Sequence, residues 1–378
     1  MIHRLQKEQI KTRLNRGKAI ILLGARQTGK TTMLKSLMAD FENSLWLNAD
    51  ESDVRVMFSD ASSTRLRTLF GGHTLVIIDE AQGITDIGLK LKLITDQIPE
   101  VQLIATGSSA IELANQANEP LTGRKWEYQL YPLSYQEMRG HNGLLEERRL
   151  LPHRMVFGYY PDVVTSPGEE RDILQQLIQS YLYKDVLMLA GIKKPDGLVK
   201  LLQALAFQVG SQVSYSELGR MTGLDGATVE RYIVLLEQAF VIFRLGSFSR
   251  NLRNELKKSN KIYFWDNGVR NALISNYNLL ELRQDVGALW ENFIISERLK
   301  YCHYQNIWSN KYFWRTHEQQ EIDYIEERDG KLFAYEFKWS QLRKKYRFSK
   351  TFLNAYPENE TAIITPENFE GFITPPLE

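Results

Sequence analysis

The stretch GARQTGKTT, residues 24–32, decides the fold of the first part of the chain. It matches the pattern G-x-x-x-x-G-K-[ST], and it lies between the apolar run AIILLG (19–24) and the helical pattern TMLKSLMADF (32–41). The apolar run predicts a buried strand, and the spacing of apolar residues after the loop predicts a helix. A strand, a glycine-rich loop and a helix in this order predict a phosphate-binding loop.

The residues of this loop have separate expected roles. Its glycines allow backbone N–H groups to turn inward around phosphate oxygens, and the helix N-terminus adds the positive end of its dipole. Lys30 is expected to reach the β- and γ-phosphates, and the Thr31 hydroxyl to hold Mg²⁺. We therefore expect ATP and Mg²⁺ as cofactors. The expected nucleotide-binding residues are Gly24, Ala25, Arg26, Gln27, Thr28, Gly29, Lys30, Thr31 and Thr32.

The stretch LVIIDEAQ, residues 75–82, supports this interpretation. Four apolar residues end in two carboxylates, which a buried strand would carry to the C-terminal edge of a parallel sheet, where ligands bind. We expect Asp79 to orient the Mg²⁺ shell and Glu80 to polarise the attacking water.

The first third of the chain repeats the alternation of strand and helix. Further strands are expected at 44–50, 74–80, 101–107 and 125–134. Strands that alternate with helices predict a parallel sheet covered on both faces, so the fold class is α/β.

A helix-turn-helix is expected at residues 213–245, after a mostly helical region from 134 to 205. An apolar strand follows the second helix and suggests a wing. The apolar face of the two helices is expected to contain Val213, Leu218, Met221, Val229, Ile233 and Leu236, and the residues presented outward are expected to be Thr228, Arg231 and Tyr232. The segment 244–261, with six basic residues and one acidic residue, could bind a phosphate backbone. The same features also occur in winged helices that bind only proteins and on solvated surfaces.

The stretch EIDYIEERDGKLFAYEFKWS, residues 321–340, predicts a hairpin around Asp329-Gly330. In that register Asp323 faces Glu336, and two facing carboxylates repel each other. One face of the hairpin gathers Glu321, Asp323, Glu336 and Lys338; the other gathers Ile322, Tyr324, Tyr335 and Phe337. A Mg²⁺ or Mn²⁺ ion between the carboxylates would remove the repulsion, and Lys338 could then position or activate a water.

Composition limits the remaining possibilities. The chain has 378 residues, enough for two or three domains, with 43% hydrophobic residues, 25% charged residues and a net charge of +1. One cysteine, Cys302, excludes a disulfide framework and fits a reducing cytoplasm. The longest apolar runs are too short to cross a bilayer, so we expect a cytoplasmic protein without a membrane partner.

The combination of GARQTGKTT, LVIIDEAQ, ATGSSA (105–110), LTGRKWEYQLYPLS (121–134) and GYYPDVV (158–164) resembles a bacterial and archaeal family of AAA-plus-type ATPases. The sequences YLYKDV (181–186), KKSNKIYFWDNGVRNAL (257–273) and the terminal hairpin resemble that family too. Its members carry a C-terminal domain described as of unknown function. The resemblance covers nearly the whole chain.

Two more catalytic residues are implied by this resemblance. In such ATPases a polar residue after the fourth strand contacts the γ-phosphate, which points to Ser108 first and Thr106 second. A helix cap is the alternative role for either side chain. Arg124, before the fifth strand, stands where the family carries an arginine finger that reaches the neighbouring subunit, which implies a homo-oligomer. A surface salt bridge is the alternative for Arg124.

The hairpin is similar to the signature of the PD-(D/E)xK nuclease fold, with an aspartate on one strand and Glu-x-Lys on the next. In that fold a preceding helix often adds a glutamate, a place that Glu291 fits. The second expected metal site therefore consists of Glu291, Asp323, Glu336 and Lys338. The chain departs from the pattern at Ile322, where the superfamily often has proline. A nuclease-like fold without cutting activity is the alternative.

The expected architecture is a P-loop parallel sheet with a helical lid, followed by a winged helix and an α/β restriction-endonuclease-like domain. The expected boundaries are 1–135 for the ATPase domain, 136–200 for the lid, 201–260 for the winged helix and 261–378 for the nuclease-like domain. We expect an ATPase that acts on DNA, and whose last domain binds DNA or cuts it. The alternatives are a nucleotide-switched signalling or defence protein that binds protein partners, and a metal-dependent nuclease gated by ATP.

Overall fold

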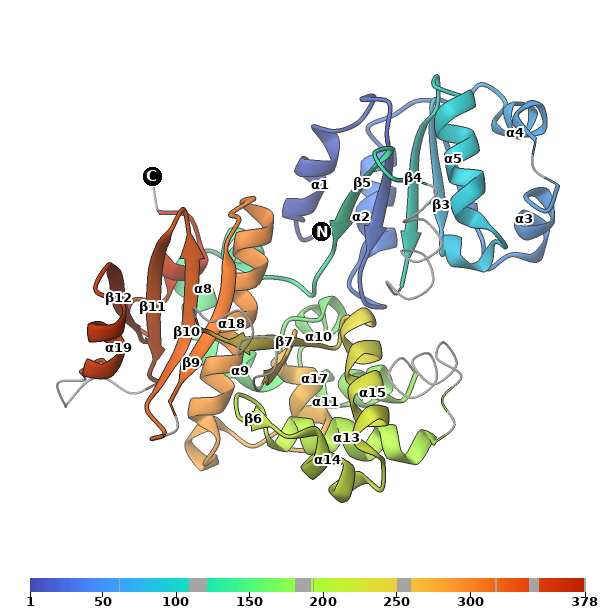
Figure 1. Cartoon of the computed structure of the whole chain (residues 1–378). Coiled ribbons are helices and arrows are strands. Elements are labelled where there is room, and N and C mark those ends of the chain that lie inside the picture. Colours follow the sequence, from blue (N-terminus) through green and yellow to red (C-terminus); the bar gives the residue numbers. More distant parts are fainter. Residues whose placement is uncertain are drawn as a thin grey trace. The chain divides into compact units, whose positions relative to one another are not determined.

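The computed structural model describes residues 1–60, 62–108, 121–180, 192, 194–249, 260–316, 318–339 and 347–376. The chain forms two compact units (Figure 1). The first contains Met1–Leu133 and Gln238–Phe240, and the second contains Ser134–Glu237 and Val241–Glu378. The boundaries expected near residues 200 and 260 thus fall inside the second unit, where they remain a proposal.

The first unit contains a five-stranded parallel sheet in the order β2-β3-β4-β1-β5. Its elements are α1 (Leu5–Lys11), β1 (Ala19–Leu23), α2 (Lys30–Met38), β2 (Ser44–Asn48), α3 (Ser52–Met57), α4 (Ser63–Phe70), β3 (Leu75–Asp79), η1 (Ala81–Gly83), α5 (Ile87–Gln97), β4 (Gln102–Gly107) and β5 (Lys125–Gln129). Each of the five expected strands is present, and β5 ends before Pro132.

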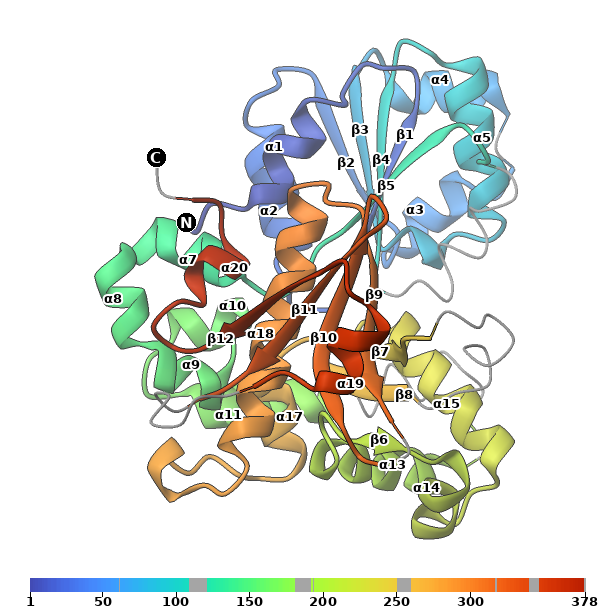
Figure 2. The same cartoon turned by 60° about the vertical axis from the view of Figure 1, so that its left-hand side comes forward.

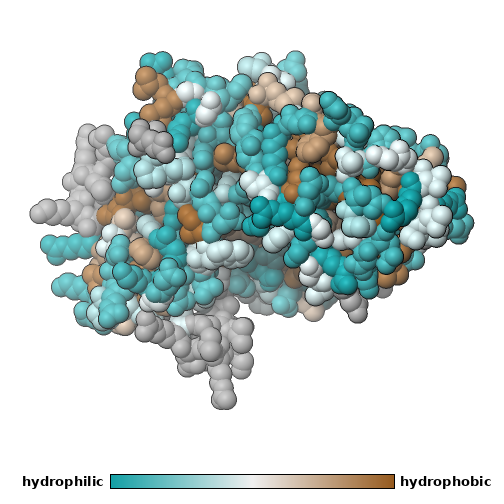
Figure 3. Space-filling model, turned by 90° about the horizontal axis from the view of Figure 1, so that it is seen from above, coloured by the Kyte–Doolittle hydropathy of each residue, from teal (hydrophilic) through white to brown (hydrophobic). Residues whose placement is uncertain are grey.

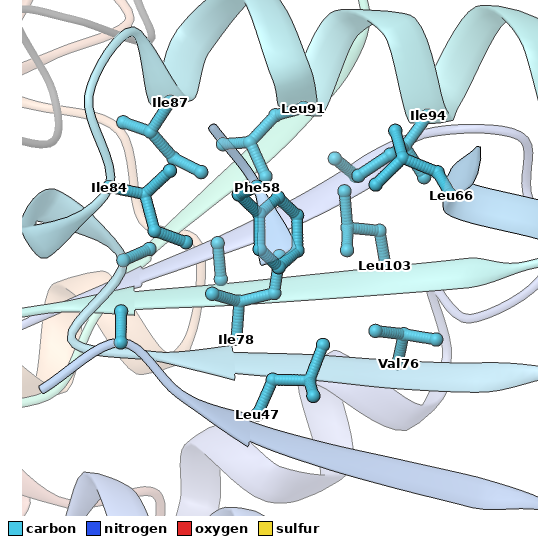
Figure 4. Close-up of a cluster of buried hydrophobic side chains, with 14 of the residues drawn as sticks. Leu47, Phe58, Leu66, Val76, Ile78, Ile84, Ile87, Leu91, Ile94 and Leu103 are labelled. Carbon is cyan, nitrogen blue, oxygen red and sulfur yellow. The ribbon is translucent and has the colours of Figure 1, made fainter. Parts of the chain in front are cut away.

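Apolar side chains alternate between the two faces of this sheet, so each face forms a separate core. In β1, Ile20 and Leu22 pack with α1 and α2, whereas Ile21 and Leu23 belong to the core under α3, α4 and α5. Figure 4 shows the second core, in which Phe58 and Leu91 lie over Ile78. Burial on both faces explains why the strands are continuous apolar runs.

The second unit begins with helices and continues into a mixed seven-stranded sheet in the order β12-β11-β10-β9-β7-β8-β6. Its helices are α7 (Tyr135–Asn142), α8 (Leu144–Arg149), α9 (Leu151–Phe157), α10 (Pro161–Thr165), α11 (Glu170–Leu177), α13 (Pro195–Phe207), α14 (Tyr215–Thr222), α15 (Gly226–Gln238), α17 (Asn267–Leu273), η4 (Leu280–Leu282), α18 (Val286–Tyr304), α19 (Lys350–Ala355) and α20 (Glu370–Ile373). Its strands are β6 (Gln212–Val213), β7 (Ile242–Ser247), β8 (Asn260–Phe264), β9 (Asn310–Arg315), β10 (Glu321–Arg328), β11 (Lys331–Phe337) and β12 (Asn359–Ile364).

The helix-turn-helix strands and the hairpin strands belong to one sheet. The short strand β6 pairs with β8, and β8 pairs with β7, which would be the strands of a winged helix. However, β7 also pairs in parallel with β9, and the Phe248 N–H donates to the Phe313 carbonyl at 2.6 Å. The strand expected as a wing is therefore an interior strand of a larger sheet. Figure 2 shows α18 beside this sheet.

The hairpin has the predicted register from Arg328–Lys331 to Tyr324–Tyr335. Beyond that pair the pattern changes, because β10 carries an irregularity between Ile322 and Ile325 where it pairs with β9. A β-bulge of this kind turns side chains away from strict alternation. Ile322, expected on the aromatic face, packs instead with Ile325 and other members of the opposite core.

Surface features agree with the mixed composition of the chain. The face drawn in Figure 3 is mostly hydrophilic, with hydrophobic side chains in small separate groups. Among the described residues, no helix combines the length and the apolar character that a membrane span requires.

Candidate functional site

The glycine-rich loop joins the end of β1 to the start of α2, as predicted. Gly29 has φ of 90°, a left-handed conformation that favours glycine. A Cβ atom on Gly24 would lie 2.2 Å from the Leu130 carbonyl oxygen, so only glycine fits there. Arg26, Gln27 and Thr32 are exposed around the loop.

Lys30 is buried at the base of the loop. Its Nζ donates to the carbonyl oxygens of Gly24 at 2.7 Å and Ala25 at 3.0 Å. Burial lowers the pKa of Lys30 to about 8, although the nearby carboxylates of Glu80 and Asp79 oppose that shift. A desolvated ammonium held by neutral carbonyls is a favourable site for a phosphate anion. The donors at this loop therefore fit a nucleotide phosphate.

Two threonines hold the Asp79 carboxylate at the end of β3. The Thr31 hydroxyl donates to Oδ2 at 3.0 Å, and the Thr106 hydroxyl donates to Oδ1 at 2.5 Å. Thr106 also accepts the Glu80 N–H at 3.0 Å. A hydroxyl and a carboxylate side by side are the oxygen ligands that Mg²⁺ uses in P-loop sites. The residues present therefore fit a nucleotide-bound Mg²⁺.

Glu80 lies just beyond the strand, in a left-handed conformation with φ of 49°. The Gln82 amide donates to its Oε2 at 2.5 Å and approaches the Ser108 hydroxyl at 3.4 Å. Ser108 is thus linked to the expected catalytic carboxylate through Gln82, whereas Thr106 contacts the Asp79 carboxylate and the backbone N–H of Glu80. The sequence ranking of Ser108 over Thr106 did not anticipate that Thr106 binds the Asp79 carboxylate directly. Ser109 and Ala110 lie outside the described residues.

Arg124 lies at the end of the sheet where the parallel strands β1 and β5 begin, whereas the phosphate-binding loop lies at the end where β1 finishes. Lys125 pairs with Ala19 at the start of β1, whereas the loop follows the end of β1. The Arg124 Nε donates to Asp96 Oδ1 at 2.6 Å. This position separates Arg124 from the nucleotide site of its own chain.

One buried arginine near the loop was not predicted. Arg4 donates to the carbonyl oxygens of Thr28 at 2.5 Å and Tyr131 at 2.7 Å. Arg4 therefore links the phosphate-binding loop to the segment that follows β5. No local pattern around Arg4 indicates this contact, because its partners are distant in the sequence.

The second candidate site lies at the hairpin. The Lys338 Nζ is 2.7 Å from Glu336 Oε2 and 3.4 Å from Asp323 Oδ2. The positive charge near the two repelling carboxylates is therefore the Lys338 ammonium. Asp323 Oδ2 also accepts the Phe337 N–H at 2.8 Å. Burial and the charge of Asp323 raise the pKa of Glu336 to about 7.

A second lysine, which the sequence analysis did not single out, contacts this site from β8. The Lys261 Nζ is 2.9 Å from Glu291 Oε1 on α18 and 2.5 Å from Glu321 Oε1 on β10. The Tyr263 hydroxyl donates to the same Glu291 oxygen at 2.6 Å. Burial alone lowers the pKa of Lys261, but the two carboxylates outweigh burial and raise it. For Glu291 burial is the stronger effect. It raises the pKa of this carboxyl to about 7, although the charge of Lys261 acts to lower it.

These groups line two pockets. Glu291, Asp323 and Lys338 line one of about 410 Å³, together with Gly287, Phe337 and Trp339. Glu321 and Glu336 line another of about 350 Å³. The carboxylate oxygens suit a hard divalent cation. Within the described part of the chain, however, no three such side chains lie close enough to hold an ion, so binding would require side-chain movement.

The helix-turn-helix agrees with the prediction only in part. Arg231 is exposed on α15, and Asp225 caps this helix by accepting the Thr228 N–H at 2.8 Å. Tyr232, expected to point outward, is 1% exposed, and Met221, expected in the core, is 56% exposed. Both expectations were wrong because periodicity fixes the spacing of a face but not the direction in which tertiary packing turns it. Residues 250–259 of the basic segment lie outside the described residues.

Three separate regions of the chain match models of protein families. Residues 16–139 match a family described as an AAA domain. Residues 148–280 and 286–370 match two families described as domains of unknown function, DUF8612 and DUF4143. The first match coincides with the parallel sheet and the phosphate-binding loop.

The Walker-type ATPase of Pyrococcus abyssi is a similar solved structure, with 15% identity and a TM-score of 0.52. The similarity covers 72% of this chain and 96% of that one. The chain has the α/β fold of an AAA-type P-loop ATPase, followed by a C-terminal α/β region.

Among curated proteins, an uncharacterized protein of Mycobacterium tuberculosis is 26% identical over 336 residues, covering 87% of this chain and 72% of that protein. An uncharacterized protein of Haemophilus influenzae is 24% identical over 282 residues, covering 67% of this chain and 68% of that protein. Each of these matches spans most of the chain, so the similarity to the two relatives is not confined to the region with the ATPase fold.

Proposed function

We propose that the chain binds and hydrolyses ATP at the loop formed by residues 24–32. The observation that carries this proposal is the joint position of Lys30, Thr31 and Asp79. The buried lysine lies against the loop carbonyls, and the Thr31 hydroxyl lies 3.0 Å from the Asp79 carboxylate. These contacts support phosphate binding and metal binding at adjacent positions.

Each residue of the site has a distinct role in the proposed reaction. Thr31 and Asp79 would hold Mg²⁺, and the ion would neutralise part of the negative charge of the phosphates. Lys30 binds the β- and γ-phosphates and offsets their negative charge. Glu80 accepts a hydrogen bond from the attacking water and orients it. The Gln82 amide contacts both Glu80 and Ser108, so Ser108 lies close enough to assist in orienting the water. Thr106 holds the Asp79 carboxylate and the backbone of Glu80 in place.

Site-directed variants test ATP hydrolysis. Lys30→Ala is expected to abolish binding of a fluorescent ATP analogue, because it removes the phosphate ligand. Glu80→Gln is expected to bind the analogue normally and to hydrolyse ATP at least about 100-fold more slowly, the usual contribution of a positioned base. Lys35→Ala, on the exposed side of the same helix, is the matched control and should behave as wild type. Undiminished turnover in Lys30→Ala would show that the site assignment is wrong.

We further propose that the ATPase acts on DNA in the cytoplasm as a homo-oligomer. The exposed Arg231 on α15 and the basic segment 244–261 support DNA contact. The hairpin carboxylates support a nuclease-like domain that binds DNA, or cuts it when Glu291, Asp323 and Glu336 hold Mg²⁺ or Mn²⁺. Arg124 would act on the nucleotide of a neighbouring subunit, since it lies away from its own site. The proposed domains keep the boundaries 1–135, 136–200, 201–260 and 261–378.

A further inference from the structure

The side chain of Gln82 connects two expected catalytic residues that follow different strands. Its Nε2 donates to Glu80 Oε2 at 2.5 Å and lies 3.4 Å from the Ser108 hydroxyl oxygen. Glu80 follows β3, and Ser108 follows β4. Among the described residues, no other side chain donates a hydrogen bond to the Glu80 carboxylate. The orientation of this carboxylate therefore depends on Gln82 within that part of the chain.

The backbone around Glu80 brings Gln82 back to the carboxylate. Glu80 has φ of 49°, and the Gly83 N–H donates to its carbonyl oxygen at 2.9 Å, which closes the turn that contains Gln82. The Glu80 N–H is held in turn by the Thr106 hydroxyl at 3.0 Å. A left-handed conformation is unfavourable for a residue with a side chain, and such conformations persist where the surrounding structure fixes them. The turn thus fixes the place of Glu80 from both its backbone and its side chain.

The contacts of the Gln82 amide also fix its orientation. An ionised carboxylate only accepts hydrogen bonds, so the amide must present its NH₂ group to Glu80. The other end of the amide, Oε1, is buried and accepts no hydrogen bond from any residue that the structure describes. A buried acceptor without a partner is a cost to stability. The contact with Glu80 is therefore retained although it leaves half of the amide unsatisfied.

Gln102 provides a contrast in the same unit. It is 6% exposed, and its Nε2 donates to the carbonyl oxygens of Lys18 at 3.1 Å and Leu103 at 3.0 Å. Its Oε1 accepts the Asn15 N–H at 2.6 Å, so both ends of this amide are satisfied. Gln102 begins β4, whereas Ser108 follows the end of that strand. Gln102 is therefore a matched control for the loss of a glutamine side chain away from the nucleotide site.

We propose that Gln82 is a positioning residue for ATP hydrolysis. It holds one oxygen of the Glu80 carboxylate and leaves the other to accept a hydrogen bond from the attacking water. Its contact with Ser108 ties the carboxylate to the end of β4, where the γ-phosphate is expected. Because a displacement of about 1 Å at a catalytic group can slow a reaction about 100-fold, this restraint matters for the rate. The inference rests on the proposed ATP hydrolysis at this site.

The test is ATP hydrolysis by the full chain, measured in the steady state and in single turnovers. Gln82→Met removes the amide, and its kcat is expected to fall at least about tenfold. The KM for ATP and the Kd for a fluorescent ATP analogue should stay unchanged, because Gln82 acts on the water and not on the nucleotide. In the Glu80→Gln background the same change should cause no further loss, because the carboxylate that Gln82 positions is gone.

Gln102→Met should keep the kcat of wild type, although it loses satisfied hydrogen bonds and should unfold at a lower temperature. Circular dichroism verifies that each variant is folded. If Gln82→Met does not fold, Gln82→Asn replaces it under the same criteria, since it keeps the amide but withdraws it by one methylene group.

The outcomes separate the possible errors. An unchanged kcat in Gln82→Met, or a raised KM alone, would overturn the inference. It is also overturned if the losses from Gln82→Met and Glu80→Gln multiply in the double variant, since Gln82 would then act independently of Glu80. An equal loss of kcat in Gln102→Met would show a general effect on the unit. If Glu80→Gln slows hydrolysis and Gln82→Met does not, only this inference fails; if neither Lys30→Ala nor Glu80→Gln slows it, the proposed function fails with it.

Discussion

At the scale of single residues, Arg124 is the side chain whose role depends most on a second molecule. Its bridge to Asp96 is at the surface, with 43% of the arginine side chain exposed. Such bridges contribute at most about 1 kcal/mol to stability. A large effect of Arg124 on ATP hydrolysis would therefore have to come from the nucleotide of another subunit.

Mixing two inactive variants tests that role. Arg124→Ala is expected to bind nucleotide normally but to hydrolyse ATP about a thousandfold more slowly, as for the loss of an arginine finger. Mixing it with Lys30→Ala should restore part of the activity, because one variant keeps the loop and the other keeps the arginine. Asp96→Ala is the control and should retain activity. A strict monomer by mass measurement, with and without an ATP analogue, would remove this role from Arg124.

At the scale of elements, the contact between α17 and the start of α18 depends on buried charges. Asp285 precedes α18, and its carboxylate lies 2.6 Å from Arg270 on α17 and 2.9 Å from Arg283. Burial alone would raise the pKa of Asp285, but the hydrogen bonds from Arg283 and Arg270 lower it to about 2. Since α18 carries Glu291, this contact also supports the hairpin site.

The shift gives a pH-dependent prediction. A depressed pKa in the folded state means that the ionised Asp285 stabilises the fold above its unfolded pKa, and that this contribution is lost as pH falls toward 2. Asp285→Asn is expected to lower the free energy of unfolding by about 2 kcal/mol at pH 7. The difference from wild type should shrink below about pH 4. Urea unfolding at several pH values measures both, and a difference independent of pH would contradict the assignment.

At the scale of the whole molecule, one sheet in the second unit combines strands that the sequence places in separate domains. The parallel contact of β7 with β9 joins the strands near the helix-turn-helix to those of the hairpin. The helix-turn-helix and the carboxylate site therefore belong to one compact unit.

Salt titration tests the proposed partner. Binding of duplex, single-stranded and branched DNA, measured by fluorescence anisotropy, should weaken steeply as salt rises, because counterions are released from phosphates. Arg231→Ala should reduce the magnitude of the slope by about one, whereas the exposed Arg149→Ala on α8 should leave it unchanged. The ATPase rate should rise with the preferred DNA. Failure to bind DNA at low salt, with or without ATP, would favour the alternative of a nucleotide switch with protein partners.

Sequence by itself determined the local features of this protein. The apolar runs predicted the five strands of the first unit, and the motif placed Lys30 and Thr31 at the loop. The Asp-Gly turn predicted the hairpin register as far as Tyr324–Tyr335. These features were predictable because strand periodicity, turn geometry and loop motifs depend on residues close together in the chain.

Only the tertiary structure decided which distant residues meet. Lys261 lies 30 residues before Glu291, and no local pattern connects their charges. The bulge that redirects Ile322 depends on the pairing of β10 with β9, and the burial of Tyr232 depends on how α15 packs. Pairings between separated strands are not fixed by local periodicity, because chain segments of many kinds can satisfy the same apolar face. The phosphate-binding loop could thus be predicted from the sequence, whereas the charge network of the hairpin required the folded chain.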